Sequence, residues 1–278
     1  MHRFTKSLFW PETAPFRGIL AQRRSLAFFM RRRLAGVDSN MLPTRFPLAW
    51  LFAAFVLGGA GSTAYAARPM MTDDARIVDP KSAQLETWVN KYRSDVEYWA
   101  LPAFNFTGNL ELTLGGARTR GDTGIRTTDQ TFQLKTLFNP LEPNKWAWGL
   151  VVGNTRHPAA PAGASVSDLY AYIPASFSFR DDRFVLHANL GWLREKTTRR
   201  NLATWGIGSE ARLNERSWFI AETFGQEREK PLYQIGFRLW LIPDRVQIDT
   251  TYGNRFGGGS EERWFSIGLR LLSAPFLP

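Results

Sequence analysis

The sequence predicts an all-β fold, a transmembrane antiparallel up-and-down β-barrel of about twelve strands. Three observations lead to this prediction. From residue 84 to residue 271 the chain repeats segments of about ten residues in which every second residue is apolar. Turns separate these segments, and aromatic residues are abundant, with 11 Trp, 7 Tyr and 21 Phe. A strand that crosses a bilayer shows one face to lipid and the other to a polar lumen, which produces this period of two.

The repeated segments divide into twelve expected strands. An even number is typical of bacterial single-chain barrels. The expected ranges are 84–92, 97–106, 109–118, 127–138, 145–154, 168–179, 183–194, 202–213, 216–226, 232–242, 244–253 and 263–272.

The last of these segments shows the alternation most clearly. Phe265, Ile267 and Leu269 share one face, which we expect to contact lipid. Ser266 and Arg270 share the other face, which we expect to line the lumen. Strands of soluble β-sandwiches and lipocalin-like barrels also alternate, so the alternation alone leaves these folds open.

The expected turns differ in length, and this difference favours a membrane barrel. If the N-terminus is periplasmic, the tight turns fall on the periplasmic side and the longer loops fall outside, as in outer-membrane barrels. A soluble sandwich has no reason to sort its turns in this way. Tight turns are expected at 107–108, 139–144, 180–182, 214–215 and 243, and longer ones at 119–126, 155–167, 195–201, 227–231 and 254–262.

Aromatic residues near the strand ends fit the same interpretation. Trp146, Tyr252 and Phe265 are expected on the outward face, close to a strand end. Aromatic side chains form girdles at the two membrane interfaces of such barrels.

The chain before the barrel is expected to consist of three parts. Residues 1–40 have no evident role and are interpreted as a mis-called extension, with translation starting at Met41. Residues 41–66 resemble a Sec signal peptide, with Arg45, the apolar run at 48–57, and Ala64-Tyr65-Ala66 as the site of cleavage after Ala66. The run is too short to span a bilayer comfortably. A periplasmic N-terminal segment is expected at 67–83, and the outer-membrane β-barrel at 84–278.

A second interpretation of the N-terminus is a twin-arginine signal at Arg23-Arg24. The triplet at residues 31–33 interrupts the apolar stretch that should follow this pair, and barrel strands are exported unfolded. Export through Sec to the outer membrane is therefore the expectation that we keep.

The charge of the chain does not indicate a nucleic-acid partner. The formal net charge is +10, but residues 1–66 hold nine of the basic residues and only two acidic ones. The remaining chain has a net charge of about +3, so the basic character belongs mostly to the segment expected to be removed. The chain has no Cys, which excludes disulfides, thiolate metal sites and a lipoprotein anchor.

Charged residues of both signs are expected inside the barrel. Unpaired ions in a narrow lumen are costly, so these side chains should pair across the interior. Two interpretations stay open, a polar path that orients a solute and a salt-bridged plug that only holds the barrel open or shut. The candidate lumen-lining residues are Glu86, Glu111, Lys135, Asp168, His187, Glu210, Arg212, Arg238, Asp249 and Arg270.

Basic residues are also frequent in the longer loops. Arginine binds phosphate through two parallel hydrogen bonds, so such a ring could contact the phosphates of lipopolysaccharide. The alternative is that longer loops simply hold more polar residues of both signs. The candidate lipopolysaccharide-facing residues are Arg194, Lys196, Arg199 and Arg200.

No pattern in the sequence indicates catalysis. Only His157 and His187 remain after signal removal, and neither stands in a His-x-Ser pair. The sequence contains no metal-spaced cluster, no Gly-x-Ser-x-Gly motif and no phosphate loop. We interpret His187 as a structural lumen residue, and we expect no enzyme activity, no cofactor and no metal.

The expected mature start resembles a known family. Residues 68–80 contain Pro69 and the stretch Thr72-Asp73-Asp74, and Gln84-Leu85-Glu86 follows after a short gap. This opening resembles the outer-membrane transporter family named for the meta-pathway of phenol degradation. The resemblance implies a channel-like barrel, with small aromatic or apolar solutes suggested by the family's name. Two departures are Lys81-Ser82-Ala83, where a Gly is common, and a C-terminus in which only Phe276 could replace the usual final aromatic.

Taken together, the sequence predicts an outer-membrane barrel that passes or binds a small solute. Its expected partners are outer-membrane lipid, lipopolysaccharide, the barrel-assembly machinery and a solute that the sequence does not identify. The alternatives are a lipid-modifying barrel enzyme, and a structural or surface-binding barrel without transport.

Overall fold

A computed structural model describes residues 70–278, except residues 123, 125, 159–166 and 197. The expectations for residues 1–40 and for the signal peptide at 41–66 lie outside the described residues. Within the described ranges, no helix is long and apolar enough to cross a membrane.

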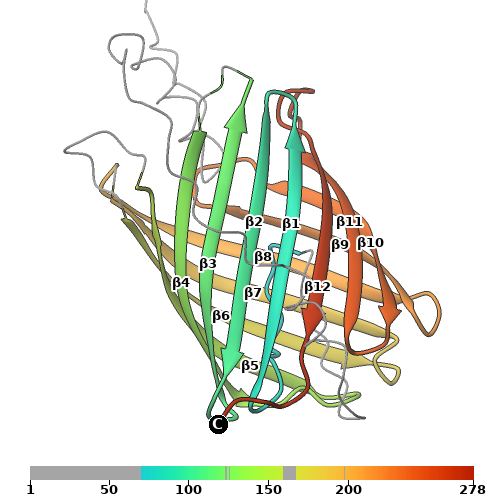
Figure 1. The fold of residues 1–278 in the computed structure, drawn as a ribbon. Coiled ribbons are helices and arrows are strands. Elements are labelled where there is room, and N and C mark those ends of the chain that lie inside the picture. Colours follow the sequence, from blue (N-terminus) through green and yellow to red (C-terminus); the bar gives the residue numbers. More distant parts are fainter. Residues whose placement is uncertain (1–69, 123, 125, 159–166, 197) are drawn as a thin grey trace, which may run out of the picture. The chain divides into compact units, whose positions relative to one another are not determined.

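The barrel consists of twelve antiparallel strands, and each strand pairs with its neighbours in the sequence (Figure 1). The circle closes where β1 pairs with β12, from Gln84 opposite Leu272 to Tyr92 opposite Trp264. The predicted fold is therefore confirmed, and each predicted strand end lies within three residues of the observed one. The strands are β1 (Ser82–Tyr92), β2 (Asp95–Asn105), β3 (Leu110–Gly121), β4 (Arg126–Asn139), β5 (Trp146–Arg156), β6 (Ser167–Phe179), β7 (Phe184–Glu195), β8 (Arg200–Arg212), β9 (Ser217–Gln226), β10 (Leu232–Ile242), β11 (Val246–Arg255) and β12 (Trp264–Leu272).

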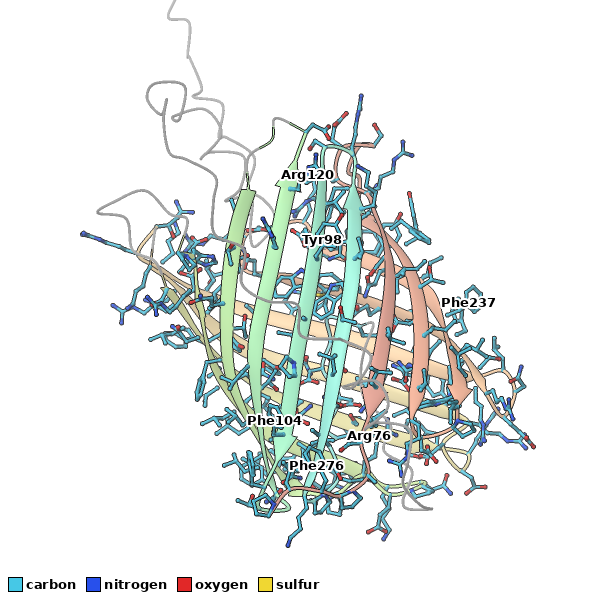
Figure 2. The ribbon with its side chains drawn as sticks, in the orientation of Figure 1. Arg76, Tyr98, Phe104, Arg120, Phe237 and Phe276 are labelled. Atoms are coloured by element: carbon cyan, nitrogen blue, oxygen red, sulfur yellow. The ribbon has the colours of Figure 1, made fainter. Side chains whose placement is uncertain are left out.

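The outer surface of the barrel is apolar. On β12 the side chain of Ile267 is 58% exposed, whereas its neighbour Ser266 is 3% exposed and points inward. Figure 2 shows Phe237 on β10 projecting away from the barrel in the same way. A soluble protein rarely exposes an apolar belt of this size, so the surface fits lipid and rules out the soluble sandwich and lipocalin alternatives.

Aromatic side chains gather near both ends of the strands. Near one end, Phe138 lies 4.4 Å from Trp148, and Phe179 lies 6.1 Å from Phe184, measured between ring centroids. Near the other end, Trp192, Tyr252, Phe256 and Phe265 are exposed. Such rings fit the two interfaces of a membrane.

Connection lengths are less sorted than the sequence predicts. One end of the barrel, here the turn end, holds connections of three to six residues together with the start of β1 and the end of β12. At the opposite end, here the loop end, the connections range from two residues, at 93–94, to ten, at 157–166. At the loop end, five strands extend two or three residues further than expected and so shorten their loops: β2, β3, β5, β8 and β11.

Residues 70–79 lie inside the barrel, and Pro80 and Lys81 are exposed where the chain enters β1. Met70, Thr72, Asp74, Ala75 and Val78 are buried, and their surroundings are side chains that point inward from the strands. This position differs from the expectation of a periplasmic segment at 67–83. The amides and acidic side chains of the segment meet complementary polar groups on the barrel wall, and Ala75 packs against Leu137 and Ala147, so the lumen holds the segment.

We predict that Ile267→Arg destabilises the barrel by about 2–4 kcal/mol, because it places a charge against lipid. Folding in vesicles, followed by heat-modifiable gel mobility, measures the effect. The matched control is Asn90→Arg, one register position away but inward-facing, where Asn90 lies 3.3 Å from the Glu97 carboxylate. Equal losses in the two variants would contradict the assignment of the lipid face.

Candidate functional site in the lumen

The structure places nine of the ten candidate lumen residues inside the barrel. Glu86 is nearly buried, and eight others are at most 9% exposed. Arg212 differs, because it ends β8 at the turn end and its exposed guanidinium lies 5.8 Å from the centre of the Trp218 ring. The eight are Glu111, Lys135, Asp168, His187, Glu210, Arg238, Asp249 and Arg270.

Several of these charges pair with one another. The Arg238 guanidinium lies 2.9 Å from the Glu210 carboxylate, and the Arg270 guanidinium lies 3.6 Å from Glu86. Arg270 also donates to Gln84 at 2.7 Å and 3.0 Å. Buried ions are tolerated only where such partners are present.

The interior segment is held largely through its backbone, and we call residues 70–80 the plug. The amides of Met71 and Thr72 donate to the two oxygens of the Glu222 carboxylate, at 2.6 Å and 2.7 Å. The amide of Val78 donates to Glu111 at 2.8 Å, and the carbonyl of Val78 accepts from Asn105 at 2.7 Å. A buried backbone outside a sheet needs such partners, and the wall supplies them.

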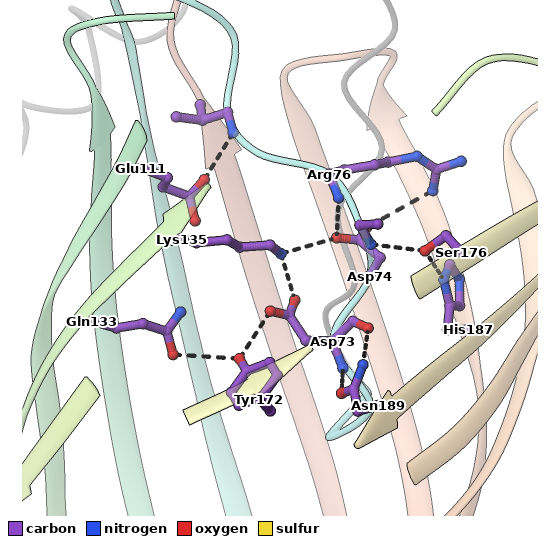
Figure 3. Close-up of polar contacts among 12 residues, drawn as sticks. Asp73, Asp74, Arg76, Glu111, Gln133, Lys135, Tyr172, Ser176, His187 and Asn189 are labelled. Carbon is purple, nitrogen blue, oxygen red and sulfur yellow. Dashed lines mark hydrogen bonds and ion pairs between the residues drawn. The ribbon is translucent and has the colours of Figure 1, made fainter. Parts of the chain in front are cut away.

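Asp73 makes the most complete set of contacts in the plug (Figure 3). Its carboxylate accepts from the Lys135 ammonium at 2.8 Å and from the Tyr172 hydroxyl at 2.9 Å. Its amide donates to the Asn189 side chain at 2.7 Å, and its carbonyl accepts from the same side chain at 2.8 Å. The Gln133 side-chain oxygen lies 3.5 Å from the Tyr172 hydroxyl and accepts a hydrogen bond from the Tyr170 hydroxyl at 3.1 Å.

Lys135 is the cation that neutralises the plug. Its ammonium is 3% exposed and lies 3.4 Å from Asp74, in addition to its contact with Asp73. In a low-dielectric interior, loss of one partner of such a group costs about 3–5 kcal/mol. Lys135 therefore contributes strongly to holding the plug in place.

The plug occupies the part of the lumen next to the turn end. Its wall partners Glu111, Lys135, Ser176, Asn189 and Glu222 each lie within five residues of that end of their strand. A small hollow in the described part of the lumen has no room for a water molecule. It is lined by Arg76, Asp182, Val185, Glu210 and Trp218.

Ser176, His187 and Glu210 form a chain that resembles a nucleophile, a base and an acid. The Ser176 hydroxyl lies 2.8 Å from His187 Nδ1, and His187 Nε2 lies 3.5 Å from Glu210. All three are buried, and the Ser176 oxygen already accepts a hydrogen bond from the Ala75 amide at 2.7 Å. A catalytic serine needs space for a substrate carbonyl, so this chain positions the plug instead.

A second polar cluster lies at the loop end. His157, just after β5, lies 2.9 Å from Asp129 on β4 and 3.3 Å from Asp168 on β6. Hydrogen bonds to these two carboxylates raise the pKa of His157 to about 9, against the opposing effect of partial burial. The cluster ties the start of the β5–β6 connection to the neighbouring strands. Among the residues that the structure describes, no group of three His, Asp or Glu is placed to hold a metal ion.

The candidate lipopolysaccharide-facing residues lie around the β7–β8 connection at the loop end. Arg194, Arg199 and Arg200 are exposed. Lys196 is half-buried, and its amide donates to the Asp168 carboxylate at 2.9 Å.

Two wall partners of the plug, Glu111 and Lys135, are among the lumen residues predicted from the sequence, but the other partners are not. Gln133 and Asn189 lie two positions from Lys135 and His187, so the period of two already places them on the lumen face. Thr72-Asp73-Asp74 is part of the stretch that resembles the meta-pathway family, but nothing in the sequence predicts that it lies inside the barrel. Tyr172, Ser176 and Glu222 are inward-facing positions on strands that we had expected.

Comparison with known proteins identifies a family. A sequence model described as "Uncharacterised conserved protein UCP029691" matches residues 53–272. The chain belongs to this family. No curated protein matches the sequence. This family is described differently from the meta-pathway family that residues 68–80 resemble, so that finer resemblance stays a prediction.

Solved structures share the fold. The KdgM porin has a TM-score of 0.50 and 8% identity, and the match covers 68% of this chain and 98% of that one. The NanC porin has a TM-score of 0.51 and 8% identity over the same shares of the two chains. At this level of identity the likeness concerns the barrel alone.

We predict that the contribution of His157 to stability depends on pH. A pKa raised from 6.5 to about 9 means that protonation favours the folded barrel. The contribution is complete below about pH 6.5 and is lost as the pH rises through 9. His157→Gln should lower the free energy of unfolding in urea by about 1–3 kcal/mol at pH 6, and by much less at pH 10.

The control for this prediction is the same substitution in a chain that carries Asp129→Asn and Asp168→Asn. In that background the effect of His157→Gln should not change with pH. A difference that stays constant from pH 6 to pH 10 in the natural background would contradict the charged cluster.

Proposed function

We propose that the protein is an outer-membrane channel for a small solute and that the plug holds it closed in the state described here. The observation that carries this proposal is a barrel with an apolar outer surface and a charged interior. Side chains of the barrel wall bind the plug, and the plug is not a strand of the sheet. A segment bound in this way can leave without breaking the barrel.

Two comparisons support the proposal. The KdgM and NanC barrels, which share this fold, are porins by their titles, and one KdgM structure is described as a complex with disordered oligogalacturonate. The opening at residues 68–80 resembles the family named for the meta-pathway of phenol degradation, which suggests small solutes. Both support a channel and neither identifies the solute.

We propose no catalytic activity. The observation that favours the runner-up, a lipid-modifying enzyme, is the chain of Ser176, His187 and Glu210. Its burial in the lumen, away from the lipid-facing surface, weighs against it. A surface-binding barrel without transport is the third candidate, and it predicts that opening the plug has no effect on conductance.

We predict that Lys135→Met increases the conductance of the refolded barrel in planar bilayers. The substitution leaves Asp73 without its cation and Asp74 with only Arg76, at 3.8 Å, and so destabilises the plug by about 3–5 kcal/mol. The natural chain should conduct rarely, and the variant should open at least ten times as often.

The matched control for this experiment is Lys145→Met, the same substitution at an exposed lysine in the β4–β5 turn. It should leave the conductance unchanged. A silent Lys135→Met barrel with normal heat-modifiable mobility would contradict the channel, and equal conductance in all three barrels would contradict closure by the plug.

We further propose that Sec exports the protein, that a signal peptide is cleaved after Ala66 and that the barrel-assembly machinery inserts it into the outer membrane. N-terminal sequencing of the protein from an outer-membrane fraction should begin at Ala67. An N-terminus at Met41 in that fraction would contradict the cleavage, and an N-terminus at Met1 would contradict both the cleavage and the interpretation of residues 1–40.

We also propose that the β7–β8 connection contacts lipopolysaccharide. The support for this contact is the exposure of Arg194, Arg199 and Arg200 at the loop end. Replacement of these three and Lys196 by Gln should reduce the lipopolysaccharide that co-purifies with the folded barrel. The control is the replacement of Arg180 and Arg183 at the turn end by Gln. An unchanged amount of co-purified lipopolysaccharide in the loop-end variant would contradict the contact.

A further inference from the structure

The wall around Asp73 has the composition of a receptor for a small carboxylate. Lys135 supplies a positive charge, and Tyr172 supplies a hydroxyl donor, to the same carboxylate. The Asn189 side chain accepts a hydrogen bond from the Asp73 amide at 2.7 Å and donates one to the Asp73 carbonyl at 2.8 Å. The side chain and the main chain of one residue are thus recognised by three side chains from β4, β6 and β7.

Other plug residues are recognised less completely. Met71, Thr72 and Val78 are bound to Glu222 and Glu111 through their amides, which any residue except Pro could supply. Recognition that is specific for side-chain charge concentrates on Asp73 and Asp74, which share Lys135.

Asp73 also lies at the accessible edge of the plug. Its side chain is 21% exposed, whereas Asp74 is 1% exposed and Lys135 is 3% exposed. A solute in the lumen can therefore reach the Asp73 carboxylate before it reaches the rest of the contact.

We propose that Lys135, Tyr172 and Asn189 form a binding site for a small solute with a carboxylate close to an amide, and that Asp73 occupies this site in the closed state. The solute competes with Asp73, and its binding releases the plug. This inference rests on the proposed channel function and adds a solute class and a mechanism of opening.

The charge of the lumen favours a solute with a single carboxylate. Three buried cations on the wall, Lys135, Arg238 and Arg270, face a larger number of buried acids. A polyanion would be repelled by these carboxylates, whereas one carboxylate replaces Asp73 without changing the balance. The buried acids are Glu97, Glu111, Asp129, Asp168, Glu195, Glu210, Glu222 and Asp249.

The absence of cysteine from the sequence allows a direct test. Thr72 is 1% exposed, so the thiol of Thr72→Cys should react slowly with a water-soluble maleimide while the plug is in place. The full-length refolded barrel in vesicles is labelled in the presence of N-acetyl-L-aspartate methylamide, which is a free copy of the Asp73 residue. The control probe is N-acetyl-L-asparagine methylamide, which has the same shape without the charge.

The acidic probe should raise the labelling rate at least tenfold in a saturable manner, and the neutral probe should leave it unchanged. Tyr172→Phe and Asn189→Ala should each raise the probe concentration needed for half of the effect. Equal effects of the two probes, or no effect of either, would overturn the inference. Met70→Cys, at a position that is 6% exposed, gives a second reporter if Thr72→Cys does not fold.

The two proposals can fail separately. Conductance that rises in Lys135→Met, together with no charge-specific labelling in Thr72→Cys, would leave the channel standing and overturn the carboxylate site. Charge-specific labelling in a barrel that never conducts would support the site and contradict the channel.

Discussion

The ion pair between the Lys135 ammonium and the carboxylates of Asp73 and Asp74 is the interaction on which the closed state depends. A buried ammonium in a narrow lumen cannot remain without a partner, because the interior screens charge poorly. The plug supplies two carboxylates, and the amides of its backbone in turn satisfy Glu111 and Glu222 on the wall. The plug and the wall therefore satisfy polar groups of each other, and neither is complete alone.

The period of two explains why the fold could be predicted from the sequence. Every strand residue faces either lipid or lumen. The alternation along β12 therefore assigns Ile267 to the lipid face and Ser266 to the lumen face without any information about the neighbouring strands. The same rule placed Lys135, His187 and Arg270 inside. The turn lengths were predicted less well, because strand ends depend on pairing between neighbours, which extended β3 and β8 into the expected loops.

The plug could not be predicted, because it has no periodicity and its partners are distributed over separate strands. Asp73 alone contacts residues 62, 99 and 116 positions away. Neutral partners such as Asn189 and Ser176 carry no signal of charge that would single them out from other inward-facing residues. The sequence left open whether the interior charges form a solute path or a plug. In the structure, residues of the plug form ion pairs with the lumen wall. The plug then describes the closed state of the protein, and the solute path describes its open state.

The most direct test of this account is a disulfide between the plug and the wall. A Cβ placed on Gly206 would lie 3.3 Å from the Cβ of Thr72, close to the separation of about 3.5–4.5 Å in disulfides. Oxidation of the full-length Thr72→Cys/Gly206→Cys barrel should give a cross-link visible by mass spectrometry of its peptides, whereas Thr72→Cys/Ile207→Cys, with its second cysteine facing lipid, should give none. Absence of the cross-link in a folded Thr72→Cys/Gly206→Cys barrel, or equal cross-linking in the two variants, would contradict a plug inside the lumen.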